Sequence, residues 1–209
     1  MRLAVNPTRM EMLKLRKRLI VAQRGHKLLK DKLDGLMKEF MNLAREYRDH
    51  RLAVDEQLPY VMKLFVLAET TSSRLITEDA LENTRQELQL TASPRRIMSV
   101  IVPSLGAEFG ASTGGFSLIH TSPDLDKAVT GLRDFLPRVL HLAELEETVR
   151  RLSSEIEKTR RRVNALEHTM IPRMVETVKF ITNKLDEMER STTTRLMKIK
   201  AQRMSQEAS

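Results

Sequence analysis

Arginine and lysine side chains are the residues of this sequence with the clearest capacity for chemistry. The densest run is Arg160-Arg161-Arg162, and a second run is Arg16-Lys17-Arg18. Guanidinium and ammonium groups bind carboxylates or phosphates, and an arginine can also stabilise a phosphoryl-transfer transition state. A charge run on a helix is equally often a solvated face. The runs alone leave a catalytic arginine, a partner contact and a plain solvated surface open.

Other chemically useful residues form no motif. The sequence has no cysteine, no phosphate loop of the Walker type and no nucleophile motif. His26 has no second ligand at helical spacing, so a packed, hydrogen-bonded histidine is favoured over a metal ligand. The five histidines are scattered at positions 26, 50, 120, 141 and 168. We therefore expect no catalytic residue, no cofactor, no metal site and no enzyme activity of the chain's own.

Charge is distributed unevenly along the chain. The net charge is +8, yet residues 1–32 alone hold ten Lys/Arg and two acids, and residues 190–203 hold five basic residues and no acid. Residues 76–121 carry a net charge of −2. Both ends of the chain are thus basic and its middle is mildly acidic.

Two long stretches carry the apolar repeat of a coiled coil, with alternating steps of four and three residues. The first row of apolar residues begins at Leu15 and reaches Ala68. The repeat shifts by one residue between Tyr47 and Val54, and after the shift the row includes Leu58. It follows Asn6-Pro7-Thr8, where Asn6 can cap a helix and Pro7 fits its first position. This pattern predicts a helix from about residue 7 to about residue 75.

The second row begins at Leu125, after the start signal Ser122-Pro123-Asp124. It shifts phase at Ile171, and Leu196 and Ile199 extend it. This pattern predicts a second helix from about residue 123 to about residue 203.

The segment between the two helices has a different composition. Residues 97–102 and 116–120 are β-type runs, and the stretch between them contains Gly106, Gly110, Gly114 and Gly115. A β-hairpin or a small β-rich knob is the economical interpretation, while residues 76–90 can be helical or loose. The expected fold is mainly α, a long antiparallel two-helix coiled coil with a small β-hairpin in its middle segment. Its parts are an N-terminal helix (1–75), a middle segment (76–121) and a C-terminal helix (122–209).

Antiparallel pairing of the helices predicts a register. It places Pro59 level with Pro137, and Asn6 level with Arg190, so that residues 191–209 project beyond the N-terminus. It also places Pro172 opposite Gly25, where the missing side chain leaves room for a bend. Both basic segments then meet at one end, which carries about thirteen positive charges. Like charges so crowded repel one another unless an acidic partner surrounds them.

Three partners fit that requirement: nucleic acid, an anionic membrane or a protein collar. None of the eight aromatic residues lies in a basic end, which disfavours nucleic acid because base stacking needs them. The apolar face of each helix is already used by the seam, which disfavours a membrane surface, and no stretch approaches the length of a membrane span. A protein collar is therefore favoured.

Four motifs resemble the D subunits of V/A-type rotary ATPases, over roughly residues 6–70 and 122–200. The motifs are Asn6-Pro7-Thr8-Arg9-Met10, residues 24–32 (RGHKLLKDK), residues 155–167 (EIEKTRRRVNALE) followed by Ile171-Pro172, and residues 195–200 (RLMKIK). The middle segment carries no such motif.

The resemblance implies a non-catalytic central rotor shaft, which transmits torque between an ATP-hydrolysing or ATP-synthesising A/B hexamer and an ion-translocating membrane ring. It implies as partners the catalytic A and B subunits, the small F subunit of the stalk and a socket subunit on the ring, without nucleic acid or membrane insertion. The expected location is cytoplasmic, peripheral to the membrane within a membrane-bound complex. Either H⁺ or Na⁺ can be the driven ion. The alternatives are a coiled-coil adaptor or nonspecific nucleic-acid scaffold and, less favoured, an enzyme.

The resemblance also suggests contact residues. For the hexamer they are Arg160, Arg161, Arg162, Arg16, Lys17, Arg18, Arg24, Arg195, Lys198 and Lys200. For the small stalk protein they are Ile97, Val100, Val102, Phe116 and Leu118.

Overall fold

The computed structural model describes residues 4–83, 88–110 and 122–207, and they form two compact units. One unit, here the terminal unit, combines the residues up to Asp34 with those from Glu157 onward. The other, the central unit, is Gly35–Ile156. The division follows contacts in space, whereas the three-part division expected from the sequence follows chain order and stays a prediction.

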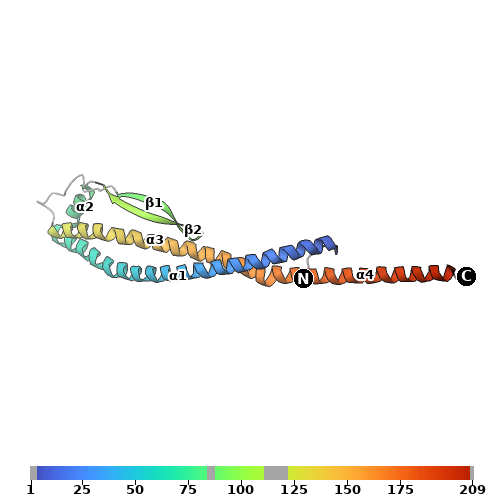
Figure 1. The fold of residues 1–209 in the computed structure, drawn as a ribbon. Coiled ribbons are helices and arrows are strands. Elements are labelled where there is room, and N and C mark those ends of the chain that lie inside the picture. The colour runs from blue at the N-terminus through green and yellow to red at the C-terminus, as the bar shows by residue number, and fades with distance from the viewer. Residues whose placement is uncertain (1–3, 84–87, 111–121, 208–209) are drawn as a thin grey trace. The chain divides into compact units, whose positions relative to one another are not determined.

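The first long helix, α1, spans Arg9–Ser72 (Figure 1). Its cap is Thr8, whose Oγ1 accepts a hydrogen bond from the N–H of Glu11 at 3.3 Å. The expectation that Asn6 caps the helix is wrong, because the Thr8 and Glu11 spacing is that of a capping box and sets the start two residues later. The helix ends before residue 75 because Ser73 takes a φ of 75°, which a continuing helix does not allow.

The second long helix consists of α3 (Pro123–Ala165), a π-helical turn η1 (Leu166–Met170) and α4 (Ile171–Glu207) (Figure 1). Ser122 caps α3 as predicted, since its Oγ accepts from the N–H of Asp124 at 3.2 Å.

The π-helical turn explains the phase shift that the sequence shows at Ile171. The N–H of Ile171 donates to the carbonyl of Leu166, five residues back instead of four. One extra residue in a turn rotates everything that follows around the helix axis. Pro172 comes directly after this turn. In a regular α-helix the ring of a proline clashes with the carbonyl four residues before it, which here belongs to the π-helical turn. The shift in the apolar repeat is thus confirmed and has a structural cause.

The central unit contains α2 (Arg74–Asn83) and a two-stranded antiparallel hairpin, β1 (Leu88–Ile97) and β2 (Val100–Phe109). The predicted hairpin exists, but its position was wrong. The run 97–102 is not one strand, because Met98 and Ser99 form the two-residue loop, and Met98 takes a φ of 53°. Gly106, expected in a loop, lies within β2. The second expected strand, 116–120, lies outside the described residues.

Two prolines face each other across this hairpin without breaking it. Pro94 pairs with Pro103 in the register. Ile97 and Val100 close the loop as a hydrogen-bonded pair, so every second pair, including the two prolines, lacks ladder bonds. Neither proline therefore removes a bond that the ladder would otherwise have.

The hairpin is attached to α3 by three side chains, which meet β2 in reverse order. Arg151 donates to the carbonyl of Ile101 at 2.9 Å, and Glu144 accepts from the N–H of Leu105 at 3.1 Å. The guanidinium of Arg133 lies 5.1 Å from the ring centre of Phe109. The first two contacts satisfy backbone groups on the strand edge that β1 does not cover, and the third is with an aromatic side chain.

Helices α1 and α3 pack against each other within the central unit. Val54, Val61, Phe135 and Leu142 form one buried cluster, and Ala68, Ala80 and Leu125 form another.

The apolar row of α1 needs no shift after Tyr47, contrary to our interpretation. Regular steps of three and four lead from Tyr47 through His50 to Val54 and then to Gln57. His50 and Gln57 are half-buried, whereas Leu58 is 39% exposed. His50 and Gln57 occupy positions on the seam, the line along which the two helices pack. A search for apolar residues missed them because both are polar.

Helix α1 also pairs antiparallel with the second long helix inside the terminal unit. Thr182 contacts Met12 at 3.5 Å, and His26 contacts Glu167 at 3.3 Å. These pairs agree with the expected register to within about one helical turn. A side chain added at Gly25 would meet no described atom within 4 Å, so the expected steric need for glycine there is not borne out. The π-helical turn, not Gly25, accommodates the proline.

Candidate partner-binding surfaces

The two units differ sharply in charge. The terminal unit contains 22 Lys/Arg and 10 Asp/Glu, a net charge of +12, and the central unit contains 14 and 18, a net charge of −4. The small excess of +8 for the whole chain conceals this segregation. The terminal unit is thus the one that attracts an acidic surface.

All ten basic residues proposed from the sequence to contact a hexamer are exposed in the terminal unit. They do not form one cluster, since Arg161 and Lys198 lie 37 residues apart on one helical path, roughly 55 Å at 1.5 Å per residue. Arg161 pairs with Glu157 on the same helix face. The ten residues therefore describe an extended charged surface rather than a single site.

The outer part of α4 is exposed on all sides. Every described side chain from Met188 to Met204 is exposed, and Leu196 and Ile199 are 62% and 50% accessible. Their expected place in the seam is therefore wrong. Helix α1, their expected partner, begins only at Arg9, which lines the same hollow as Glu189.

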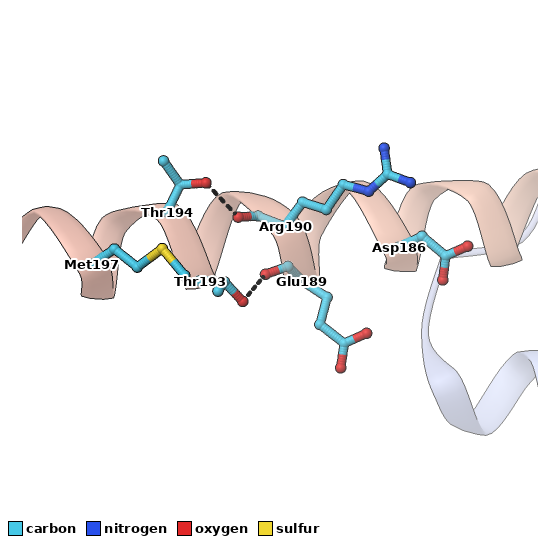
Figure 2. Close-up of a pocket in the computed structure, with 6 residues that line it drawn as sticks. All are labelled: Asp186, Glu189, Arg190, Thr193, Thr194 and Met197. Carbon is cyan, nitrogen blue, oxygen red and sulfur yellow. Dashed lines mark hydrogen bonds between the residues drawn. The ribbon is translucent and has the colours of Figure 1, made fainter.

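A shallow hollow lies on this outer stretch (Figure 2). The hydroxyls of Thr193 and Thr194 donate to the carbonyls of Glu189 and Arg190, both at 2.9 Å. These bonds turn the threonines toward their own helix backbone. The side chains that remain available to a partner are Asp186, Arg190 and Met197, which line the hollow.

The hairpin offers a smaller apolar surface in the central unit. Of the residues proposed to contact a small stalk protein, Val100 and Val102 are buried and Ile97 is half-buried. Phe116 and Leu118 lie outside the described residues. The most exposed apolar side chains of the two strands are instead Leu90 on β1 and Ile101 on β2, at 58% and 48%, and Met98 in the loop is also exposed. Sequence alternation could have separated Ile101 from Val100 and Val102, since neighbours on a strand face opposite sides.

Shifted pKa values occur only at ion pairs on helix surfaces, among the described groups. A hydrogen bond from Arg151 lowers the pKa of Glu147, and one from Lys184 lowers the pKa of Glu187. The hydrogen bond to Asp55 raises the pKa of Arg51. Opposite charges cause each of these shifts, so they indicate helix pairing rather than a tuned acid or base.

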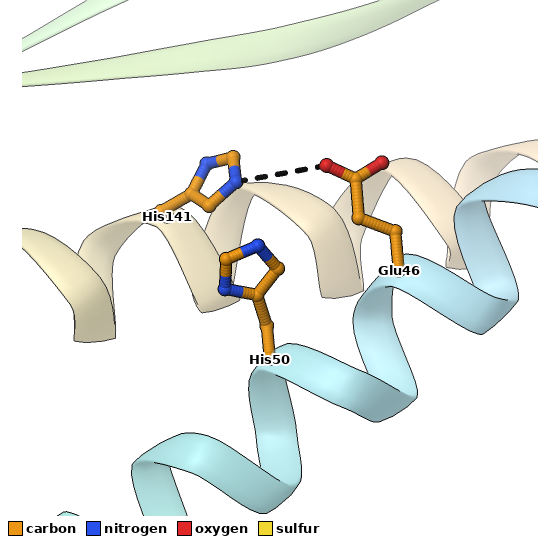
Figure 3. Close-up of side chains that lie close together, drawn as sticks. All are labelled: Glu46, His50 and His141. Carbon is orange, nitrogen blue, oxygen red and sulfur yellow. Dashed lines mark ion pairs between the residues drawn. The ribbon is translucent and has the colours of Figure 1, made fainter.

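One side-chain cluster was missed by the sequence analysis. Glu46 and His50 on α1 meet His141 on α3, from a segment some ninety residues later in the chain (Figure 3). The uninterrupted heptad repeat of α1 could have revealed His50, because it places His50 at a seam position. Finding His141 beside it required knowledge of how α1 and α3 align.

No helix in the described part of the chain is long and apolar enough to cross a membrane. The fold and the surfaces together define a class of protein: a mainly helical chain of paired long helices whose terminal unit exposes a large basic surface.

Comparison with known proteins identifies the family. The chain belongs to the family of ATP synthase D subunits, which it matches over residues 11–201. It is 48% identical to the V-type ATP synthase D subunit of Acetivibrio thermocellus over 97% of this chain and 93% of that protein. It is 46% identical to the protein of the same name from Fusobacterium nucleatum, over 95% and 96%. The family expected from the sequence is confirmed, and it supports the role of a rotary-ATPase stalk component over that of an adaptor or nucleic-acid scaffold.

Proposed function

We propose that this chain is the central rotor shaft of a V-type ATP synthase, a non-catalytic component that transmits torque between the A/B hexamer and the ion-translocating ring. Membership of the D-subunit family supports this role. The structural observation that carries it is the segregation of charge, with +12 in the terminal unit and −4 in the central unit. A protein with one strongly basic, exposed unit is suited to insertion into an acidic collar.

The character of the exposed contacts suits a part that must turn. Screened charge pairs at exposed sites contribute about 0–1 kcal/mol each, so each can be broken and replaced during rotation. The buried seam has the opposite character, because its apolar side chains tie the two helices together within each unit. Torque is then carried by the seam, and the partner is held by exchangeable charges.

The hexamer contacts are assigned to the basic residues of the terminal unit. The group comprises Arg160, Arg161, Arg162, Arg16, Lys17, Arg18, Arg24, Arg195, Lys198 and Lys200. A socket subunit on the ring and the small F subunit of the stalk would bind elsewhere, the latter at the hairpin. Burial of Val100 and Val102 favours Leu90 and Ile101 for direct contact with that small partner. In this arrangement the chain is cytoplasmic and peripheral to the membrane.

A pair of charge-reversal variants tests the role. Lys198→Glu with Lys200→Glu changes the outer stretch of α4, and Arg45→Glu with Lys63→Glu makes the same charge change on exposed residues of the central unit. We expect the first pair to weaken binding to a reconstituted A/B hexamer at least tenfold and to abolish ATP-driven rotation. The control pair should change the affinity less than threefold. Equal effects of the two pairs would refute the assignment of the terminal unit to the hexamer.

A further inference from the structure

The side chains of Glu46, His50 and His141 converge on one point between α1 and α3 in the central unit (Figure 3). Glu46 and His50 are one turn apart on α1, and their ligand atoms lie within 4.8 Å of one another and of a ring nitrogen of His141. Nε2 of His141 lies 3.9 Å from Oε1 of Glu46. The two imidazole rings are 4.8 Å apart and nearly perpendicular, at 85°.

The existing contacts do not account for this grouping. A distance of 3.9 Å is long for an ion pair, and the pair is exposed, so its contribution to stability is small. His50 occupies a seam position between Tyr47 and Val54, where an apolar side chain would pack better. A half-buried histidine at such a position costs stability unless another interaction uses it.

Two imidazoles and one carboxylate form a ligand set with a known preference. Neutral imidazole nitrogen and carboxylate oxygen bind zinc and its neighbours in the first transition series, and three protein ligands leave a fourth position for water. Hard cations such as Mg²⁺ and Ca²⁺ prefer oxygen ligands throughout. The chemistry therefore points to a borderline divalent transition metal.

The geometry requires only a local contraction. Ligand atoms of a tetrahedral zinc site lie about 3.4 Å apart, given metal–ligand bonds of about 2.0–2.1 Å. The separations here are at most 4.8 Å, so the excess is about 1.4 Å, a shift on the scale of side-chain rotation. The side chains of Glu46 and His141 are 48% and 44% exposed, so an ion and a water ligand can reach the site.

We propose that Glu46, His50 and His141 form a binding site for Zn²⁺ or a similar divalent transition metal, and that the bound metal links α1 to α3. Two ligands come from one helix and one from the other, so the bound ion joins the helices across their seam. Metal binding then stabilises their pairing, since the unfolded chain does not hold the three ligands together. The inference is independent of the rotor role, because it concerns only contacts within the central unit.

The test uses the full chain, stripped with a chelator and titrated with Zn²⁺ in a calorimeter. We expect one equivalent to bind per chain, and the melting temperature to rise by about 5 °C or more at free Zn²⁺ a hundred times the dissociation constant. Substituting His50→Gln or His141→Gln should weaken this binding at least ~10-fold, since even indirect ligand support is worth that much. Absence of a one-equivalent binding step would overturn the proposal.

Two further variants keep the result specific. Glu46→Gln changes an exposed side chain and leaves the seam intact, so it reports on the site even if the His50 variant folds poorly. It should also weaken binding. His168→Gln, at an exposed histidine of η1 outside the cluster, is the matched control and should leave zinc affinity unchanged. If all the histidine variants bind Zn²⁺ equally well, the ion is held elsewhere and the site does not exist.

Discussion

The carboxylate of Glu144 accepts a hydrogen bond from the backbone N–H of Leu105 at 3.1 Å, which ties a helix side chain to the free edge of a strand. Arg151, two turns further along α3, donates to the carbonyl of Ile101 on the same edge. Seven residues of helix and four of strand span similar lengths, roughly 10 and 13 Å, so the two contacts are in step. The hairpin is thus aligned along α3 by two charged side chains that bond to backbone groups of the strand edge at a fixed spacing.

Removing the carboxylate should loosen the hairpin. We expect Glu144→Ala to lower the local opening free energy at Leu105 by about 1.5–3 kcal/mol, because a charge-assisted hydrogen bond is lost. Amide hydrogen exchange at Leu105 should accelerate at least about tenfold, with a smaller effect for Glu144→Gln, which keeps an acceptor. Glu146→Ala, at an exposed neighbour on the same helix, serves as the control. Unchanged exchange in the Glu144→Ala variant would show that the other contacts of the hairpin hold it without this hydrogen bond.

Two glycines of α1 should respond differently to alanine. A side chain at Gly25 meets no described atom, so Gly25→Ala should raise the unfolding free energy by about 0.5–1 kcal/mol through helix propensity. At Gly35 the new Cβ would lie 2.8 Å from Cε of Met98 in the hairpin loop. Gly35→Ala should therefore raise the unfolding free energy by less than Gly25→Ala does, as measured by urea denaturation. The shortfall should vanish in a Met98→Ala background, and its persistence there would exclude the loop contact as the cause.

Two buried threonines provide a second matched pair. The hydroxyl of Thr159 is buried and has no hydrogen-bond partner among the residues that the structure describes. Thr159→Val keeps the shape and removes an unsatisfied polar group, so we expect about 1 kcal/mol of stabilisation, or a melting temperature roughly 2–4 °C higher. Thr177 is equally buried, but its hydroxyl donates to the carbonyl of Arg173 at 2.7 Å. Thr177→Val should give no gain, and a loss in the Thr159 variant would reveal a partner for that hydroxyl.

Glu147 should stay ionised at lower pH than an ordinary glutamate. Its pKa is lowered chiefly by the hydrogen bond from Arg151, at 2.7 Å, and further by the charge of Arg150. A lowered pKa in the folded state means that the pairing stabilises the protein above the unfolded-state pKa, and that this stabilisation is lost as the pH falls through the folded value. Carboxyl-carbon NMR titration should show the low value. Arg151→Gln should raise it, whereas Arg133→Gln, on the same helix, should leave it where it was.

Local information determined the helices and their ends to within a few residues. The heptad rows, the cap at Ser122 and the phase shift at Ile171 are patterns within a short stretch of chain, and the backbone obeys them because each helical bond is local. The errors at Asn6 and Leu58 were errors of choice between residues one or two positions apart. The family motifs lie in these same helices, which explains why the family was also predictable.

Tertiary structure decided the hairpin and the side-chain clusters. The sequence marked 97–102 as a strand, but only pairing with residues 88–97 places the turn at Met98 and Ser99, because strand partners are chosen by distant contacts. Glu144 meets Leu105, and His141 meets His50, only once α3 lies along its neighbours. The sequence predicted that the two basic ends meet, but the extent of the basic unit and its net charge of +12 followed only from the contacts that the fold makes.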